Sequence, residues 1–420
     1  MRISTIQAFN NGVAGIQRNY ANATRTQEQI STRNRILTPA DDPVASVRLL
    51  QLEQQQNVLT QHKDNLTAAK NSLAQEEVTL NSVNTVLQRV RELAVQAGNG
   101  ALSQNDRQSI AAELGEREDE LFGLMNTRNA RGEYLFAGFQ GKTQPFVRQA
   151  DGSYTYEGDE GQRKLQIASS LNVPISDNGK KTFENVINAG RLQLTPPAPP
   201  FTATPGSTLQ VSAPLVQDEV AFSGATPFPA GGVEVVFGVV PNQNNYAIYG
   251  LPRTVGDAPL PDGSGSLDAD PAKADKLVFR GVTLQFSGAP VGGEKVQLSV
   301  DPTQQKRGIL DTIAQLKASL EGPASGFKIG DAVAVAITNL DHGMTTVDSV
   351  RGEIGARLNV VETSQTDNDD VSLVNKGVQA DLRELDYAEA LSRLAFQSII
   401  LEASQQSYVK ISSLNLFNKL

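Results

Sequence analysis

The sequence has 420 residues, enough for roughly two to four domains. Its net charge of −9 disfavours a partner that needs a basic face, such as nucleic acid. Cysteine is absent, which excludes disulfides and thiolate zinc sites, and only His62 and His342 are present for imidazole chemistry. No apolar run approaches the ~18 residues of a membrane span, and the N-terminal residues lack the apolar stretch of a secretory signal. These signals alone predict a cytosolic chain.

Apolar residues at the start of the chain recur every seven positions in two rows, which is typical of a helix packed against other helices. The rows are Ile6, Val13 and Tyr20, and Phe9, Ile16, Ala23, Ile30 and Leu37. We therefore expect residues 1–42 to form an amphipathic assembly helix.

The stretch RNRILTPADDPVAS, residues 33–46, interrupts this pattern. Pro39 cannot continue a helix, while Asp42 suits an N-cap and Pro43 suits the first helical position. Asp41 and Asp42 are alternatively a metal-binding or acid–base pair, but no third ligand or histidine is near in sequence. The pattern favours a helix joint made by Pro39, Asp41, Asp42 and Pro43.

Two long helices are predicted for residues 43–140. Leucine recurs every seven residues at Leu52, Leu59, Leu66, Leu73, Leu80 and Leu87, and nothing interrupts the helix from Pro43 to Ala97. Ser103 and Asp106 have the spacing of a capping box that starts a second, antiparallel helix. These helices would form the core of a bundle.

The C-terminal third returns to helical patterns. Residues 303–370 are predicted to return through the bundle, with Asp331 capping a helix and the polar stretch 362–370 forming a joint. The last segment, 371–420, is apolar on most sides, so other copies of the chain would have to cover it. The candidate assembly residues are Ile6, Phe9, Val13, Ile16, Tyr20, Ile30, Leu391, Leu394, Phe396, Ile399, Ile400, Leu414 and Phe417.

Between these ends, residues 141–302 are rich in proline, glycine and short β-type runs. The runs KLVFRGVTLQFSG and EKVQLSV, joined by APVGG, indicate strands in a hairpin-like arrangement. The sequence thus predicts an α+β fold, in which a long coiled-coil-like helical bundle of both chain ends carries an inserted β-rich domain.

The sequence contains only weak matches to catalytic and ligand-binding motifs. GFQGKT at 138–143 ends like a P-loop, but Phe136 stands where that motif needs glycine. DGSGSLDAD at 262–270 resembles a calcium loop without its glycine and terminal glutamate, so a flexible loop is favoured. Neither histidine has the spacing of a metal motif. We predict no enzymatic activity, cofactor or metal.

Three blocks together resemble the bacterial flagellin family. NRILTPADDPVAS is similar to the helix joint near the start of these proteins, and residues 87–114 are similar to a core-domain motif. RGEYLFAGFQGKTQPF, residues 131–146, and the ending YVKISSLNLFNKL resemble the branch that forms the hook–filament junction. The resemblance covers residues 1–146 and about 306–420.

The resemblance implies a structural adaptor that joins the flagellar hook to the filament, with the β-rich insert facing outward. It implies export in an unfolded state through the flagellar type III channel without a cleaved signal, and an extracellular location, which replaces the cytosolic expectation. The implied partners are the first hook-associated protein, flagellin, further copies of the chain in a ring, and an export chaperone. Nucleic acid and membrane are not implied.

Two amphipathic chain ends suit folding coupled to assembly, so we expect residues 1–40 and 385–420 to be disordered in the free monomer. A bundle folded within one chain would produce the same apolar periods. The resemblance also places Arg89, Leu93 and Glu113 at positions that an innate receptor contacts in flagellins, although this surface is more simply explained by subunit packing. The alternative functions are filament flagellin and a secreted coiled-coil effector or adhesin whose β domain binds a host surface.

Overall fold

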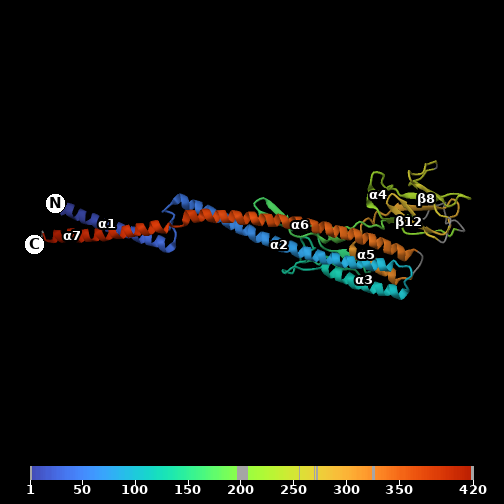
Figure 1. The fold of residues 1–420 in the computed structure, drawn as a ribbon, viewed down its shortest axis with the longest axis horizontal. Coiled ribbons are helices and arrows are strands. Elements are labelled where there is room, and N and C mark those ends of the chain that lie inside the picture. The colour runs from blue at the N-terminus through green and yellow to red at the C-terminus, as the bar shows by residue number, and fades with distance from the viewer. Residues whose placement is uncertain are drawn as a thin grey trace. The chain divides into compact units, whose positions relative to one another are not determined.

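A computed structural model describes residues 2–195, 207–254, 256–268, 270, 273–323 and 327–417, with the main chain alone for 2–6, 8 and 412–417. The chain divides into two compact units, residues 1–67 with 362–420 and residues 68–361, and each is described by itself. The predicted α+β class is confirmed (Figure 1).

The helices are α1 (Arg2–Thr32), α2 (Pro43–Ala97), α3 (Gln104–Met125), α4 (Glu219–Ser223), α5 (Ile309–Glu321), α6 (Lys328–Arg383) and α7 (Tyr387–Phe417), with a π-helical turn η1 (Lys180–Glu184). α2 has the bounds that the leucine repeat predicts. The capping box before α3 is also confirmed, since the Ser103 side chain accepts a hydrogen bond from the main-chain N–H of Asp106, and the Asp106 carboxylate accepts one from the main-chain N–H of Ser103.

Two predictions for α6 are wrong. The polar stretch 362–370 is not a joint, because α6 continues through it to Arg383 and the break lies at 384–386. That stretch contains neither proline nor glycine, and a polar composition alone does not end a helix. Asp331 is not an N-cap, because α6 already begins at Lys328; its Oδ2 instead accepts a hydrogen bond from the main-chain N–H of Ala213 (2.7 Å).

The strands are β1 (Phe146–Arg148), β2 (Tyr154–Tyr156), β3 (Lys164–Ala168), β4 (Leu171–Pro174), β5 (Leu192–Thr195), β6 (Gln210–Val211), β7 (Leu215–Val216), β8 (Val233–Phe237), β9 (Asn245–Gly250), β10 (Ser264–Ser266), β11 (Asp275–Phe279), β12 (Val282–Ser287) and β13 (Lys295–Val300). One sheet has the order β10-β9-β8-β13-β5, and a second has the order β11-β12-β6, with β7 also paired to β12. All pairs in both sheets are antiparallel.

Two predictions for this region are also wrong. β12 and β13 do not form a hairpin; β12 pairs with β11, while β13 pairs with β8 and β5 of the other sheet. The true hairpin turns at Arg280 and Gly281, which both have positive φ (44° and 79°), as a two-residue hairpin turn requires. Residues 262–270 are not simply a loop, because Ser264–Ser266 pairs with β9.

The insert has two parts within the unit 68–361. Side chains from the two sheets between Leu192 and Leu298 form a separate apolar core. In contrast, the part from β1 to η1 is bonded to the helices: the main-chain N–H of Asp177 donates to Glu76 of α2 (3.0 Å), and Arg148 pairs with Glu118 of α3 (2.7 Å). The domain bounds given above stay a prediction, but this division indicates that only the second part is a self-contained sandwich.

Candidate assembly surface

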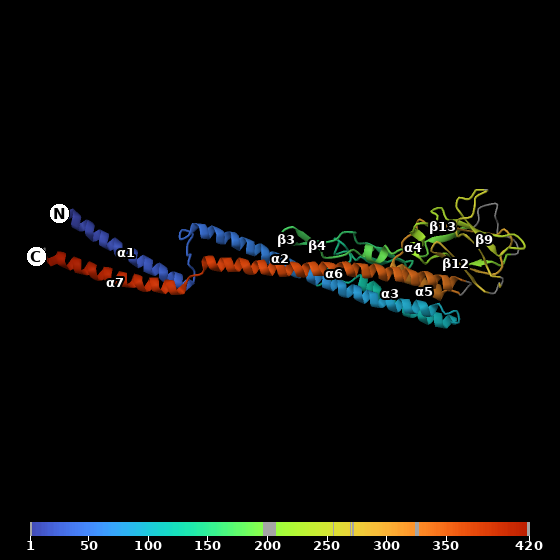
Figure 2. The ribbon, with the colours of Figure 1, turned by 45° about the horizontal axis from the view of Figure 1, so that its top comes forward.

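Helices α1 and α7 lie side by side and run in opposite directions, so that the start of α1 and the end of α7 lie at the same end of the pair (Figures 1 and 2). Tyr387 Oη donates a hydrogen bond to Ile30 O (3.1 Å) near the joint. Far from it, the rings of Phe9 and Tyr408 pack with centroids 5.1 Å apart. The first and last helices of the chain therefore form one antiparallel hairpin.

This pair has almost no core. Among its described side chains, only Thr26, Gln29 and Ala390 are buried. Its exposed large apolar side chains include Phe9 (51%), Tyr20 (63%), Leu391 (53%), Phe396 (65%), Ile399 (64%), Ile400 (37%), Val409 (63%) and Ile411 (66%). An exposed apolar surface of this extent is typical of an interaction site.

The predicted assembly residues fall into three groups. Phe9, Tyr20, Leu391, Phe396, Ile399 and Ile400 are exposed, while Val13, Ile16, Ile30 and Leu394 are half-buried. The side chains of Ile6, Leu414 and Phe417 lie outside the described residues. Ile411 extends the exposed stripe, and Tyr408 is half-buried against Phe9. Their spacing of three residues in the final helix could have identified them. The assignment of these residues to an assembly interface stays a prediction.

The predicted joint is confirmed as structural. Asp42 Oδ1 accepts a hydrogen bond from the main-chain N–H of Ala45 (2.9 Å), which is the N-cap contact of α2. Asp41 Oδ2 accepts hydrogen bonds from the main-chain N–H groups of Leu37 (3.0 Å) and Thr38 (3.1 Å), and its other oxygen pairs with Arg25. Both carboxylates are thus used to shape the chain between α1 and α2.

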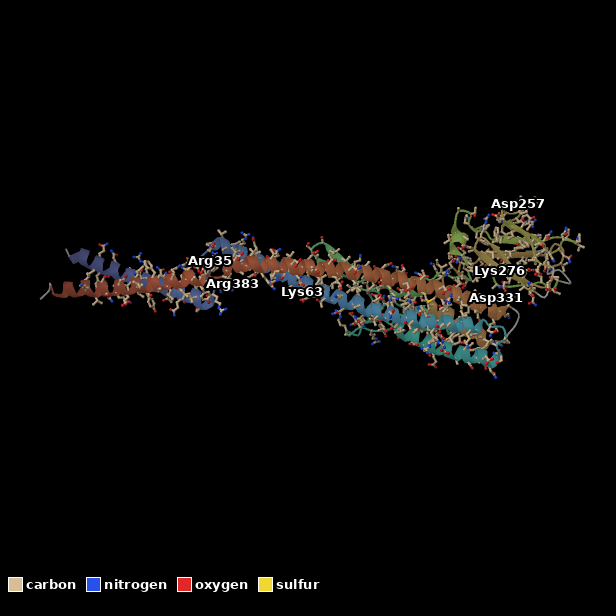
Figure 3. All side chains as sticks on the ribbon, in the orientation of Figure 1. Arg35, Lys63, Asp257, Lys276, Asp331 and Arg383 are labelled. Atoms are coloured by element: carbon tan, nitrogen blue, oxygen red, sulfur yellow. The ribbon has the colours of Figure 1, made fainter. Side chains whose placement is uncertain are left out.

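The two joints of the chain are themselves paired. The main-chain N–H of Arg35 donates to the carbonyl of Arg383 (2.8 Å), and that of Leu385 donates to the carbonyl of Arg33 (3.1 Å). Figure 3 labels Arg35 and Arg383 at this contact. Arg33 has a positive φ of 61°, which is unfavourable for a residue with a side chain. No sequence pattern could reveal this bridge, because it joins residues from opposite ends of the chain.

Beyond the joints, α2 and α6 meet through side-chain amides. Asn368 Nδ2 donates to Leu59 O (3.1 Å), and Asn375 Nδ2 donates to Leu52 O (3.0 Å). Both asparagines are at least nine-tenths buried. The two contacts are seven residues apart on each helix, so they repeat with the heptad of the seam.

A cluster around the buried carboxyl group of Glu76 lies in the other unit. Glu76 of α2 is 1% exposed, and its Oε1 accepts a hydrogen bond from the main-chain N–H of Asp177 (3.0 Å). Burial and the neighbouring Asp177 charge raise the pKa of Glu76 well above its usual value, although Arg357 and Arg163 act in the opposite direction. Arg357 of α6 pairs with Asp177 (2.7 Å), so this cluster ties the insert to both long helices.

The surface suggested by Arg89, Leu93 and Glu113 is only partly present. Arg89 pairs with Glu113 (2.8 Å) across two helices, and both side chains are partly exposed. Leu93 is 1% exposed because it packs in the helical core, so its inclusion in a surface is wrong. A receptor contact through Arg89 and Glu113 stays a prediction.

The remaining motifs show no arrangement for chemistry. Lys142 lies exposed in a turn, and His342 Nδ1 contacts Ile187 O (2.9 Å). Within the described residues, no three His, Cys, Asp or Glu side chains are grouped to hold a metal ion. Across the same ranges, no helix has both the length and the apolar character to cross a membrane.

The structure defines an α+β class of protein in which the first and last helices form a hairpin with exposed apolar side chains. Residues 3–141 match the bacterial flagellin N-terminal helical region. This match lies in the first third of the chain and agrees with the resemblance found in the sequence.

Particular relatives narrow this class. The chain is 34% identical over 186 residues to flagellar hook-associated protein 3 of Salmonella typhimurium, and 33% identical over 186 residues to that of Escherichia coli. The match covers 44% of this chain and 58% of each relative, so the chain spans less than two thirds of their length. A 112-residue match to the flagellar filament 41 kDa core protein of Borreliella burgdorferi, 38% identical, covers 27% of this chain.

Solved structures of flagellar proteins share the fold of this chain. The crystal structure of flagellar hook-associated protein 3 from Legionella pneumophila superposes with a TM-score of 0.62 at 25% identity, covering 79% of this chain and 98% of that chain. The FlgL structure from Xanthomonas campestris, at 22% identity, shares the fold with a TM-score of 0.59, covering 78% of this chain and 99% of that chain.

Proposed function

We propose that the chain is a structural adaptor of the bacterial flagellum, which joins the hook to the filament by co-assembly of its terminal helices. The observation that carries this proposal is the α1–α7 hairpin, whose apolar side chains are exposed along both helices. Free of neighbours, such a hairpin buries too little apolar surface to offset the entropy of ordering it. Covered by neighbouring chains, it becomes part of a continuous helical assembly.

The adaptor acts outside the cell, after export through the flagellar channel. Its partners are the first hook-associated protein on one side, flagellin on the other, and further copies of itself in a ring, with an export chaperone in the cytoplasm. The similarity to hook-associated protein 3 supports these partners. The role requires no catalytic activity and no cofactor.

Deletion of the gene tests the proposal. Intact hooks without filaments, together with flagellin released into the medium, are expected from the loss of a junction. Filaments of normal number and length on the deletion strain would contradict the junction role. A plasmid copy of the full chain provides the matched control.

A further inference from the structure

A cationic pocket of about 560 Å³ lies beside the paired joints, within the unit of residues 1–67 and 362–420. Its lining includes Arg33, Lys376, Arg383 and the amide of Gln379, against one carboxylate, Glu384. The pocket is thus lined mainly by groups that donate hydrogen bonds to an anion.

Several of these donors have no partner among the residues that the structure describes. Among the described residues, neither Arg33 nor Lys376 forms an ion pair through its side chain. Gln379 Nε2 is buried and likewise has no hydrogen-bond partner within the described ranges. Arg383 is only partly satisfied, with Asn34 Oδ1 at 3.1 Å and Glu53 at 3.9 Å. Leaving a buried donor unpaired is unfavourable, so the pocket is suited to an acceptor from outside the chain.

The same helix carries the complementary charge on another side. Asp367 and Asp370 of α6 are exposed, and neither forms an ion pair among the described residues. Asp367 and Lys376 are nine positions apart, about two and a half helical turns, so their side chains project from opposite sides of α6. Asp367 and Lys376 therefore cannot pair with each other on the same helix.

We propose that the carboxylates of Asp367 and Asp370 of one copy dock into the Arg33–Lys376–Arg383 pocket of a second copy. The contact is heterologous, because a different side of α6 is used on each copy, and repetition of such a contact closes a ring or extends a helix. It sets which neighbours meet and in what register, beyond the apolar burial of the terminal hairpin. The inference rests on the proposed adaptor function.

Disulfide trapping tests the contact directly, because the natural chain has no cysteine. Full-length chain with Asp370→Cys and Lys376→Cys is expressed in the deletion strain, and hook-filament structures are isolated and oxidised. A ladder of linked multimers is expected from the double variant and no linked species from either single variant. Dimers of Lys376→Cys alone would indicate a symmetric contact and overturn the proposal. Lys142→Cys with Asp370→Cys is the control pair.

Charge reversal supplies a second test that does not require cysteines. Two variants are made: one carries Lys376→Glu, and the other carries both Asp367→Lys and Asp370→Lys. Each is expected to lower the number of filamented cells about tenfold, since like charges then face each other. The chain with all three reversals is expected to regain filaments. Lys142→Glu is the matched surface control.

The outcomes separate this proposal from the adaptor function. If the deletion strain loses its filaments but both charge-reversal strains keep normal filaments, the proposed contact is wrong and the adaptor function still stands. Loss with Lys376→Glu but not with the aspartate reversals would show that another protein occupies the pocket, which also overturns docking of a second copy. Filaments in the deletion strain would contradict the adaptor itself.

Discussion

The side-chain amide of Asn375 donates a hydrogen bond to the main-chain carbonyl of Leu52 on the facing helix, at 3.0 Å. Asn375 and Asn368 continue the seven-residue row that runs along α6 from Val333 to Val361. Every member of that row from Val333 to Val361 is apolar and buried, whereas its next two members are amides. Buried amides in such a seam fix the register of the helices and lower their stability.

Replacing both amides should therefore strengthen the helix pair. We expect the double variant Asn368→Leu, Asn375→Leu to raise the free energy of unfolding of the monomer by roughly 1–2 kcal/mol. The reason is that burial of two leucine side chains stabilises the fold more than the two neutral hydrogen bonds that are lost. Urea unfolding followed by circular dichroism measures the change. Asn57→Leu, at an exposed position of α2, is the control, and a decrease in the double variant would contradict the role assigned to the amides.

The free monomer should be disordered at both ends. Because α1 and α7 bury so few side chains, we expect brief trypsin treatment of dilute monomer to cleave within residues 1–40 and 385–420 while residues 68–361 stay intact. Mass spectrometry of the fragments locates the cuts. Protection of Arg18, Arg25 and Arg393 in the monomer would instead support a bundle folded within one chain.

The Glu76 cluster predicts a pH dependence. Its raised pKa means that the folded chain keeps a proton that the unfolded chain releases, so the stabilisation is full below the usual carboxyl range and is lost as the pH rises through the folded-state pKa. Glu76→Gln keeps a neutral side chain at every pH. We expect it to raise the free energy of unfolding at pH 8 and to flatten the pH profile.

Urea unfolding at several pH values between 5 and 9 measures this effect. Glu77→Gln is the neighbouring control: Glu77 is partly exposed and pairs with Arg351 at 2.8 Å, so its loss should give no gain at pH 8. Asp177, Arg357 and Arg163 stay in place in both variants, together with Glu353, which pairs with Arg357. A Glu76→Gln chain that is less stable than the natural chain at pH 8 would show that the group is folded in its charged form.

The part of the insert that forms its own two-sheet core should be removable. The main-chain N–H of Asp301 donates to the carbonyl of Arg191 at 2.9 Å, so the two strands that lead into the sandwich leave the helices side by side. A chain in which residues 192–300 are replaced by a short glycine–serine linker should fold and restore filaments to the deletion strain. Filament counts by electron microscopy measure this. Failure to assemble despite normal helical content would place part of the junction contact in the sandwich.

The sequence predicts the helical part well, because heptads, a capping box and a proline pair are local signals. The bounds of α2 and the N-cap at Asp42 follow from them. The polar residues 362–370 do not end the helix, because they occupy its exposed side and, at Asn368, its seam. The helix actually ends where Glu384 forms a bridge with Asn34, a contact from the far end of the chain.

Strand pairing in the insert was harder to predict. Residues near in sequence, such as β12 and β13, lie in different sheets, while β5 and β13 pair across about a hundred residues of chain. Short alternating runs do not say which partner a strand chooses, because several registers bury the same apolar side chains. The cationic pocket was missed for a related reason, since Arg33 and Lys376 meet only through the fold.

The pairing of the two joints has a mechanical consequence. Through the bonds of Arg35 with Arg383 and of Leu385 with Arg33, the connection after α1 and the connection before α7 are fastened at one level. A pull on either terminal helix is therefore shared by α2 and α6, and neither covalent link carries the whole load alone. Tension at this point acts on a closed loop of backbone, which resists twisting better than a single strand.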